Sequence, residues 1–91
     1  IGNGVIINKS CTLSHNTLIG DCSFVSPSVT FCGGAELGNS SFVGAGTIIS
    51  NEVKIGNQVK IGIGSVITRD ISDDLSVIGN PARVVKDLKI K

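Results

Sequence analysis

The residue of this chain best suited to acid–base chemistry is His15, its only histidine, in the stretch TLSHNTLIGDC at residues 12–22. An imidazole is largely neutral at pH 7, so it can take a proton from a hydroxyl or an amine as that group attacks a thioester. Such a direct attack needs no covalent enzyme intermediate. We therefore treat His15 as a candidate general base, and the alternative is a polar residue in a turn.

Cysteine offers a second kind of chemistry, which the sequence does not favour. Cys11, Cys22 and Cys32 form no C-x-x-C pair, and an odd number of cysteines cannot all pair within one chain. No serine or cysteine forms a recognisable activated pair with His15. We interpret the three cysteines as reduced, small, partly buried residues.

The elements that must position these residues follow from a six-residue repeat. Every sixth residue is apolar, and the residue four positions later is small or β-branched, which gives two inward-facing positions per repeat. Six is a multiple of two, so strand alternation is kept from one hexad to the next, whereas an α-helix would drift off its stripe. The apolar series is Ile1, Ile7, Leu13, Ile19, Val25, Phe31, Leu37, Val43, Ile49, Ile55, Ile61 and Ile67. The second series is Val5, Cys11, Thr17, Ser23, Val29, Ala35, Ser41, Thr47, Val53, Val59, Ser65 and Ile71.

Each hexad is a short strand plus a corner, and three strands close a triangular coil of 18 residues. Residues 1–72 then form about four coils of a parallel β-helix. Residues 18 apart stack on one another, which places Gly33 beside His15 in the next coil. Gly34 follows, so this corner offers bare backbone, room for a ligand and an N–H group for a developing oxyanion.

Outward-facing residues stack in columns in the same way. The first column is mostly apolar, the second is apolar or β-branched, and the third is mostly polar and faces solvent. Phenylalanines on the first column cannot reach an interior that is already filled, so we expect a partner surface there, and a homotrimer would supply it. Scattered surface apolar residues are the alternative. The columns are Ile6, Phe24, Phe42 and Lys60; Thr12, Thr30, Ile48 and Val66; and Leu18, Glu36, Lys54 and Ser72.

The repeat stops after Ile71. The following DDLSVIGNPARVVKDLKIK predicts a loop, a Gly-Asn-Pro turn and a short amphipathic helix with Val84, Val85 and Leu88 at helical spacing. This tail, residues 73–91, would cap the open end of a β-helix over residues 1–72. The first coil has no such cap, which suggests that further chain precedes Ile1.

Composition restricts the partners. Lysine and arginine total 8 against 7 for aspartate and glutamate, a balance without the basic excess of a nucleic-acid-binding surface. No apolar run approaches the ~20 residues of a membrane span, and no signal peptide is evident. We expect one cytoplasmic domain with no nucleic-acid or membrane partner, and a domain this short gains stability from a partner subunit.

The repeat resembles that of the hexapeptide-repeat acyltransferases, whose domain is a left-handed parallel β-helix. Within them, the chain is similar to the sialic acid O-acetyltransferase and bacillosamine-type sugar N-acetyltransferase family, over SHNTLIGDCSFVSPSVTFCGGAELGNSSFVGAGTIISNEVKIGNQVKIGIGSVITRDI and the later VIGNPARVV. This resemblance implies that His15 is the general base and that Gly33 lies against the acetyl group or the acceptor. A single histidine lacks the three ligands of the metal-dependent carbonic anhydrases built on a similar solenoid, so we expect no metal.

The resemblance also implies where acetyl-CoA would lie. In the family it runs along a groove between subunits and contacts backbone at later corners, which here are Ala45 in VGAGT and Ile63 in IGIGS, with Phe24 flanking the donor. Ordinary turn residues are the alternative at each position. The segment GNPAR, residues 79–83, is similar to the segment near the distal end of the donor, where Arg83 meets a phosphate or stays solvated.

Two departures from the family concern the base and the acceptor. Some members carry a carboxylate directly after the histidine, but here Asn16 adds no charge, so Glu36, Glu52 or a carboxylate of a neighbouring subunit would have to orient the imidazole. Members usually also carry a small α/β domain for the acceptor, which has no counterpart in this sequence.

These observations predict an acetyl-CoA-dependent acetyltransferase that acts on a hydroxyl or an amine of a sugar or nucleotide-sugar. One alternative is a non-catalytic trimerising β-helix. The other is a serine or small-alcohol O-acetyltransferase, because the last coils and GNPAR are not unique to sugar enzymes.

Overall fold

The computed structural model describes residues 1–87, which form eleven strands of two residues and two longer strands at the C-terminal end. Corners of four residues separate all of the short strands, as the hexad spacing predicts. The short strands are β1 (Ile6–Ile7), β2 (Thr12–Leu13), β3 (Leu18–Ile19), β4 (Phe24–Val25), β5 (Thr30–Phe31), β6 (Glu36–Leu37), β7 (Phe42–Val43), β8 (Ile48–Ile49), β9 (Lys54–Ile55), β10 (Lys60–Ile61) and β11 (Val66–Ile67). The longer strands are β12 (Leu75–Gly79) and β13 (Ala82–Asp87).

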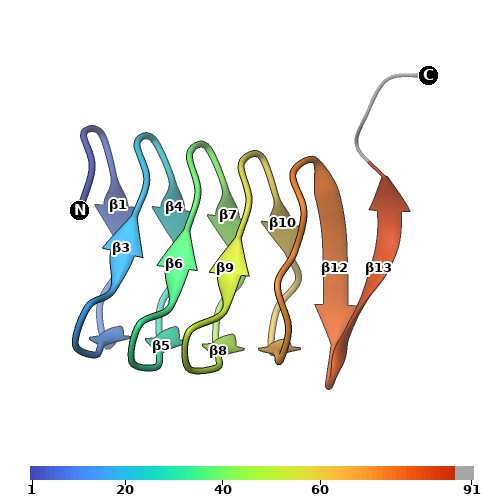
Figure 1. Cartoon of the computed structure of the whole chain (residues 1–91). Helices are drawn as coiled ribbons and strands as arrows, with labels where there is room; N and C mark the ends of the chain where they lie inside the picture. The colour runs from blue at the N-terminus through green and yellow to red at the C-terminus, as the bar shows by residue number, and fades with distance from the viewer. Residues whose placement is uncertain (88–91) are drawn as a thin grey trace.

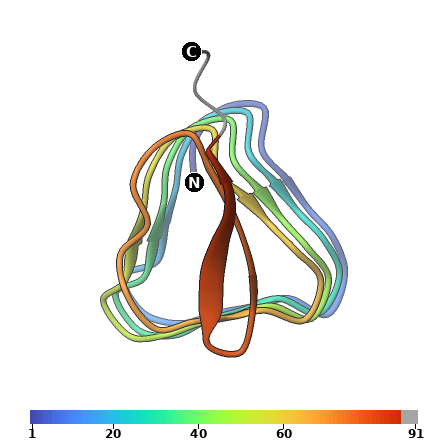
Figure 2. The same cartoon turned by 90° about the vertical axis from the view of Figure 1, so that its right-hand side faces the viewer.

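The short strands stack into three parallel sheets that form the faces of a triangular prism (Figures 1 and 2). The strand orders are β1-β4-β7-β10-β12-β13, β11-β8-β5-β2 and β3-β6-β9. Residues 18 apart pair across β1 to β11, for example Phe24 with Phe42 and Thr30 with Ile48. The predicted first and second outward columns are confirmed, and so is the third column as far as Lys54.

The interior of the prism holds the two inward series of each hexad. Phe31, Val43 and Ile49 are completely buried, as are several hydroxyl side chains at the second inward position. Most of those hydroxyls donate to backbone carbonyls of the next coil, as Ser23 Oγ does to Gly38 O at 2.7 Å and Ser41 Oγ does to Gly56 O at 2.9 Å, whereas Ser65 Oγ donates to Gly62 O of its own corner at 2.6 Å. The small polar residues are therefore compatible with the core because each one is hydrogen-bonded.

Each four-residue corner turns the chain through a residue in the left-handed backbone region. Glycine fills this position at Gly4, Gly34, Gly46 and Gly64, where φ lies between 66° and 74°. Other residue types fill it elsewhere, including Asn16 at 57°, Glu52 at 59° and Gln58 at 56°. Such a conformation is unfavourable for a residue with a side chain, and least so for Asn and Asp.

The corner between β3 and β4 and its equivalents carries a ladder of Asn and Asp side chains. The N–H of Asn3 donates to Asp21 Oδ1 at 2.8 Å, and that of Asp21 donates to Asn39 Oδ1 at 2.8 Å. The ladder continues at 2.7 Å from Asn39 to Asn57 and from Asn57 to Asp73. Each side chain thus satisfies a corner N–H of the preceding coil, so these N–H groups are already hydrogen-bonded within the chain.

The sequence predicts that the repeat stops after Ile71, but in the structure the repeat continues. Ile71 pairs with Ile55, and Val77 pairs with Ile61, so the last coil stacks at a separation of 16 residues. The corner after Ile67 is two residues shorter than the others, and beyond it the hexad resumes from Ile71 to Val77. The placement of Ser72 on the third column is wrong for the same reason, because Asp70 takes that position and accepts a hydrogen bond from the Lys54 N–H at 2.8 Å.

The predicted C-terminal helix is also wrong, because Val84 and Val85 lie in strand β13. Strand β12 extends the first sheet beside β10, and β13 pairs with β12 in antiparallel orientation after a turn at Asn80 and Pro81. β-branched valines suit an extended strand, and β12 offers them a free edge to pair with. The resulting hairpin lies at the C-terminal end of the prism, where a capping tail was predicted (Figure 2). Leu88, the third residue of the predicted helix, lies outside the described residues.

The part of the chain that the structure describes contains no helix long and apolar enough to cross a membrane.

Candidate active site

His15 lies in the corner between β2 and β3, and its exposed side chain leans onto the next coil. A Cβ atom at Gly33 would collide with His15 Nε2 and Cε1 and would lie 3.2 Å from Cδ2. The Gly34 N–H donates to the His15 carbonyl at 2.9 Å, which fixes the two coils against each other. Only a glycine at position 33 lets the imidazole rest on bare backbone, as the stacking of the sequence predicts.

Gly33 is buried beneath the His15 ring, and its N–H differs from the equivalent N–H groups of the Asn and Asp ladder. At the equivalent position of the Asn and Asp ladder, each corner N–H donates to a side chain. Within residues 1–87, nothing accepts a hydrogen bond from the Gly33 N–H. A proton acceptor and an unused backbone donor therefore lie side by side at one corner, which is an arrangement suited to acyl transfer.

Glu52 borders the same corner from the opposite side. Its N–H donates to the Gly33 carbonyl at 2.9 Å, and its Cγ lies 3.1 Å from where a Cβ of Gly34 would stand. The glycine pair is thus flanked by an imidazole from the preceding coil and a carboxylate-bearing side chain from the following coil.

The structure does not supply the orienting carboxylate that the sequence led us to expect for His15. Glu36 forms an ion pair with Lys54 at 3.5 Å instead. No ion pair joins His15 to Glu52 or to another acidic side chain within residues 1–87. Neither named candidate therefore contacts the imidazole within this chain.

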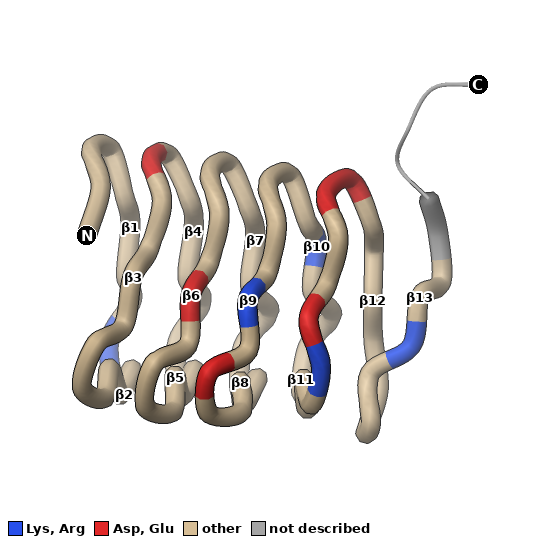
Figure 3. Tube along the Cα trace, viewed as in Figure 1, with Lys and Arg blue, Asp and Glu red and all other residues tan. Residues whose placement is uncertain are grey.

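A groove of about 560 Å³ adjoins the corner along the third face of the prism. Acidic and basic residues alternate along this face at β6 and β9 (Figure 3). The Lys54 ammonium faces Glu36, and the Lys54 N–H binds Asp70, so two of the three acidic residues in the groove have partners. Its lining residues are Asn16, Leu18, Gly34, Glu36, Glu52, Lys54 and Asp70.

The residues expected to contact acetyl-CoA lie at a different corner from His15. Ala45 and Ile63 occupy stacked corners between the first and second sheets, joined by the bond from the Gly64 N–H to Ala45 O at 2.8 Å. Their own N–H groups have no acceptor within residues 1–87. The sheet β11-β8-β5-β2 separates this corner from His15, so one chain does not bring the two sets into a single site.

Phe24 lies on the first face, in β4, and stacks on Phe42 of β7. The ring centroids are 5.5 Å apart with an angle of 13° between the planes. Both rings remain exposed, Phe24 by 37% and Phe42 by 42%. The pair forms an aromatic surface on β4 and β7, and the Ala45 corner follows β7 in the chain.

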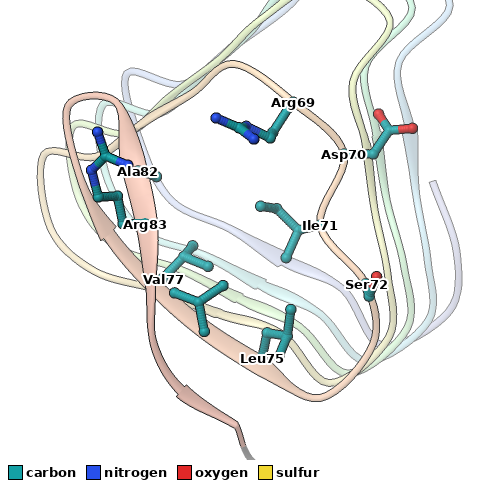
Figure 4. Close-up of a pocket in the computed structure, with 9 residues that line it drawn as sticks. Arg69, Asp70, Ile71, Ser72, Leu75, Val77, Ala82 and Arg83 are labelled. Atoms are coloured by element: carbon teal, nitrogen blue, oxygen red, sulfur yellow. The ribbon is translucent and has the colours of Figure 1, made fainter.

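Arg83 lies at the C-terminal end of the prism, away from His15. It lines a cavity of about 250 Å³ between the hairpin and the last corner, together with Arg69 (Figure 4). The apolar side chains of Ile71, Leu75 and Val77 also line this cavity. Arg69 lies in the short corner between β11 and Ile71, at the same end of the solenoid.

Solved structures share this fold with the chain. The acetyltransferase domain of PglB from Neisseria gonorrhoeae, in complex with acetyl coenzyme A, is 34% identical with a TM-score of 0.88, and the match covers 90% of this chain and 40% of that one. Soybean serine acetyltransferase is 29% identical with a TM-score of 0.86, over 92% of this chain and 39% of that one. The hexapeptide-repeat-containing acetyltransferase VCA0836 from Vibrio cholerae is 20% identical with a TM-score of 0.80, over 99% of this chain and 74% of that one, and it supports the fold alone.

Neither a protein-family model nor a curated protein sequence matches the chain. The chain spans about 40% of the PglB domain and a similar share of the soybean enzyme. The predicted fold, a single-stranded left-handed parallel β-helix of about four coils, is confirmed. The chain therefore has the β-helix of the hexapeptide-repeat acetyltransferases, and the resemblance to that family stated from its sequence is confirmed.

Proposed function

We propose that the chain is the donor-binding and catalytic part of an acetyl-CoA-dependent acetyltransferase, with a hydroxyl or an amine of a sugar or nucleotide-sugar as acceptor. One observation carries the proposal, namely that the His15 imidazole lies on Gly33, whose N–H has no acceptor within residues 1–87. The 34% identity to a domain that binds acetyl coenzyme A supports the choice of donor.

The chemistry assigned to the corner is direct attack on the thioester. His15 Nε2 takes the proton of the acceptor O–H or N–H while the acceptor atom bonds to the acetyl carbonyl carbon. The Gly33 N–H donates to the oxyanion that forms on the carbonyl oxygen. When the intermediate collapses, the carbon–sulfur bond breaks, and the CoA thiolate takes the proton back from the imidazolium.

The proposal includes a homotrimer, because one chain holds only half of the site. His15 and Gly33 lie at corners that follow strands of the second sheet, β11-β8-β5-β2. Ala45 and Ile63 lie at corners that precede strands of the same sheet. A neighbouring copy would bring its Ala45–Ile63 corner and its Phe24 to the first copy's His15 corner, with acetyl-CoA in the groove between them. The N–H groups of Ala45 and Ile63 would then donate hydrogen bonds to the amide carbonyls of the donor.

A cytoplasmic location belongs to the same proposal. Cys11, Cys22 and Cys32 are all free, as is usual in a reducing compartment.

The first experiment is a titration of the chain with acetyl-CoA, with the His15→Ala variant beside it. We expect about one donor site per chain in both proteins, because the imidazole acts on the acceptor and not on the donor. We expect His15→Ala to lower acetyl transfer by about 100-fold or more, since a positioned general base contributes on that order. Transfer at the original rate in His15→Ala would refute the assignment of the base.

A further inference from the structure

The edge of the prism that carries His15 also carries an asparagine that forms no ladder bond. Counting the inward apolar residue of each hexad as the first position, every ladder side chain takes the third position. Asn51 takes that position one coil after Gly33, so by the ladder geometry its Oδ1 should accept the Gly33 N–H. Asn39 Oδ1 accepts the Asp21 N–H in this way at 2.8 Å. Within residues 1–87, however, the Asn51 side chain forms no hydrogen bond and the Gly33 N–H has no acceptor. One bond of the expected pattern is therefore missing at the candidate active site.

A glycine precedes every residue whose N–H donates in the ladder, and the structure shows why. A Cβ atom at Gly2 would collide with Asp21 Oδ1, and one at Gly20 would collide with Asn39 Oδ1. The Cβ at Gly2 would also lie 2.8 Å from the Asp21 backbone nitrogen, well inside the usual contact distance. The φ of these glycines is not in the left-handed region, so they are required for space and not for backbone conformation. The four glycines are Gly2, Gly20, Gly38 and Gly56. The ladder bond therefore forms where the second position of the hexad carries no side chain.

Cys32 occupies this second position directly before the glycine under the imidazole. Its N–H donates to Ile49 O at 2.9 Å, as the N–H of the ladder glycine Gly20 donates to Leu37 O at 2.8 Å. The backbone hydrogen bonding is thus the same at the two corners, and the difference lies in the side chain. The Cβ atom of Cys32 takes the space in which Asn51 Oδ1 would have to lie to form the ladder bond.

We infer that Cys32 is a positioning residue that keeps the Gly33 N–H available to the oxyanion, because its Cβ atom prevents Asn51 from accepting that N–H. This inference rests on the proposed function, in which the Gly33 N–H stabilises the charge on the carbonyl oxygen. An N–H already bonded to an amide oxygen could take that role only after the bond had been broken. The thiol itself takes no part, so a small side chain with a Cβ atom can replace Cys32.

The test replaces Cys32 by glycine, which makes this corner match the four ladder corners. In Cys32→Gly we expect Asn51 Oδ1 to accept the Gly33 N–H, so the Gly33 amide should exchange with solvent about tenfold more slowly. Acetyl transfer should fall by about tenfold, because the new hydrogen bond must break before the thioester carbonyl can use the N–H. Hydrogen exchange of the isotope-labelled chain, followed by nuclear magnetic resonance, gives the first quantity, and release of CoA thiol gives the second.

Three further variants separate the Cβ atom from the thiol and from the effect of a glycine itself. Cys32→Ala keeps the Cβ atom, so both the exchange of Gly33 and the transfer rate should match the original chain. Ser50→Gly adds a glycine at the same position one coil later, where the following corner offers Arg69 instead of an acceptor, so neither quantity should change. Adding Asn51→Ala to Cys32→Gly removes the acceptor and should restore both quantities, whereas Asn51→Ala alone should change neither. A merely structural role of Cys32 would not be rescued by removing a second side chain.

The reciprocal change tests the same rule at a ladder corner, away from His15. Gly20→Ala adds a Cβ atom where Asn39 Oδ1 lies, so the Asp21 amide should lose its acceptor and exchange faster. This measurement keeps the inference testable if Cys32→Gly does not fold. An unchanged Asp21 amide in Gly20→Ala would overturn the rule on which the role of Cys32 depends.

Hydrogen exchange distinguishes failure of this inference from failure of the proposed function, because it needs no acetyl-CoA. Unchanged Gly33 exchange in Cys32→Gly would overturn the inference, and so would an equal loss of transfer in Cys32→Ala and Cys32→Gly. Transfer that depends on His15 but is as fast in Cys32→Gly as in the original chain would keep the proposed function and refute the role of Cys32. Slower Gly33 exchange that Asn51→Ala reverses, in a chain that transfers no acetyl groups, would support the exclusion of Asn51 and refute the proposed function.

Discussion

Replacement of Gly33 by alanine tests whether this glycine serves the imidazole or the fold. The three atoms nearest to an added Cβ all belong to the His15 ring, and no backbone atom is among them. The φ of Gly33 is not in the left-handed region, so alanine can adopt the same backbone. The added methyl group must therefore push the ring aside by about 1 Å, since carbon atoms pack at about 3.5–4.0 Å.

The expected result is a large kinetic effect with a small effect on stability. A displacement of about 1 Å at a catalytic group can cost about 100-fold in rate. The free energy of unfolding should change by less than about 0.5 kcal/mol, because a surface imidazole can rotate at little cost. Urea unfolding followed by circular dichroism gives the stability, and release of CoA thiol gives the rate.

The His15→Ala background supplies the control for Gly33→Ala. Without the ring there is nothing to displace, so adding Gly33→Ala to His15→Ala should lower the rate no further. Two results would refute the reasoning. One is a Gly33→Ala protein that transfers acetyl groups at the original rate. The other is a loss of more than about 2 kcal/mol of stability, which would show that the glycine is required by the fold.

Two further predictions concern the solenoid itself. Phe31→Ala should lower the free energy of unfolding by about 3–5 kcal/mol, because Phe31 is completely buried in the coil core, and urea unfolding would measure this; a loss below about 1 kcal/mol would contradict a packed interior. Asn57→Ala should lower it by about 0.5–1.5 kcal/mol, because the Asn39 N–H loses the acceptor that it contacts at 2.7 Å, whereas Asn51→Ala at a corner without such a bond should change it little. Equal losses in the two asparagine variants would show that the ladder bonds carry no stability of their own.

The fold could be predicted because its rules are local and repeat. A period of six residues keeps the same side chains inward at every turn, so the stacks from Ile6 to Phe42 and from Thr12 to Val66 follow from counting alone. The same counting places Gly33 beside His15. The corner geometry also follows, since Gly, Asn and Ser tolerate the left-handed backbone that each turn requires.

The elements that were predicted wrongly depend on contacts between residues that are far apart in the sequence. In the sequence, the corner between Ile67 and Ile71 is two residues short, and this interruption resembles the end of the repeat. Only the pairing of Ile71 with Ile55 shows that the same column continues. Val84 and Val85 fit a helical stripe by spacing, but the free edge of β12 makes them a strand. The position of Glu52 opposite His15 depends on side-chain direction as well as stacking, which the order of residues does not specify.

The ladder of Asn and Asp residues connects successive coils of the solenoid through the same hydrogen bond at every step. In each coil a corner N–H donates to the Asn or Asp side chain of the following coil. A whole coil inserted in the middle would therefore find the same hydrogen-bond partners on both sides. Each such insertion would lengthen the prism by about 4.8 Å, the spacing between neighbouring strands. Arg69 of the last corner and Arg83 of the C-terminal hairpin would then move away from His15 in fixed steps, while the corner that holds the imidazole on Gly33 would stay unchanged. The distance between the His15 corner and the C-terminal end of the prism can therefore be changed without changing the corner that carries the proposed chemistry.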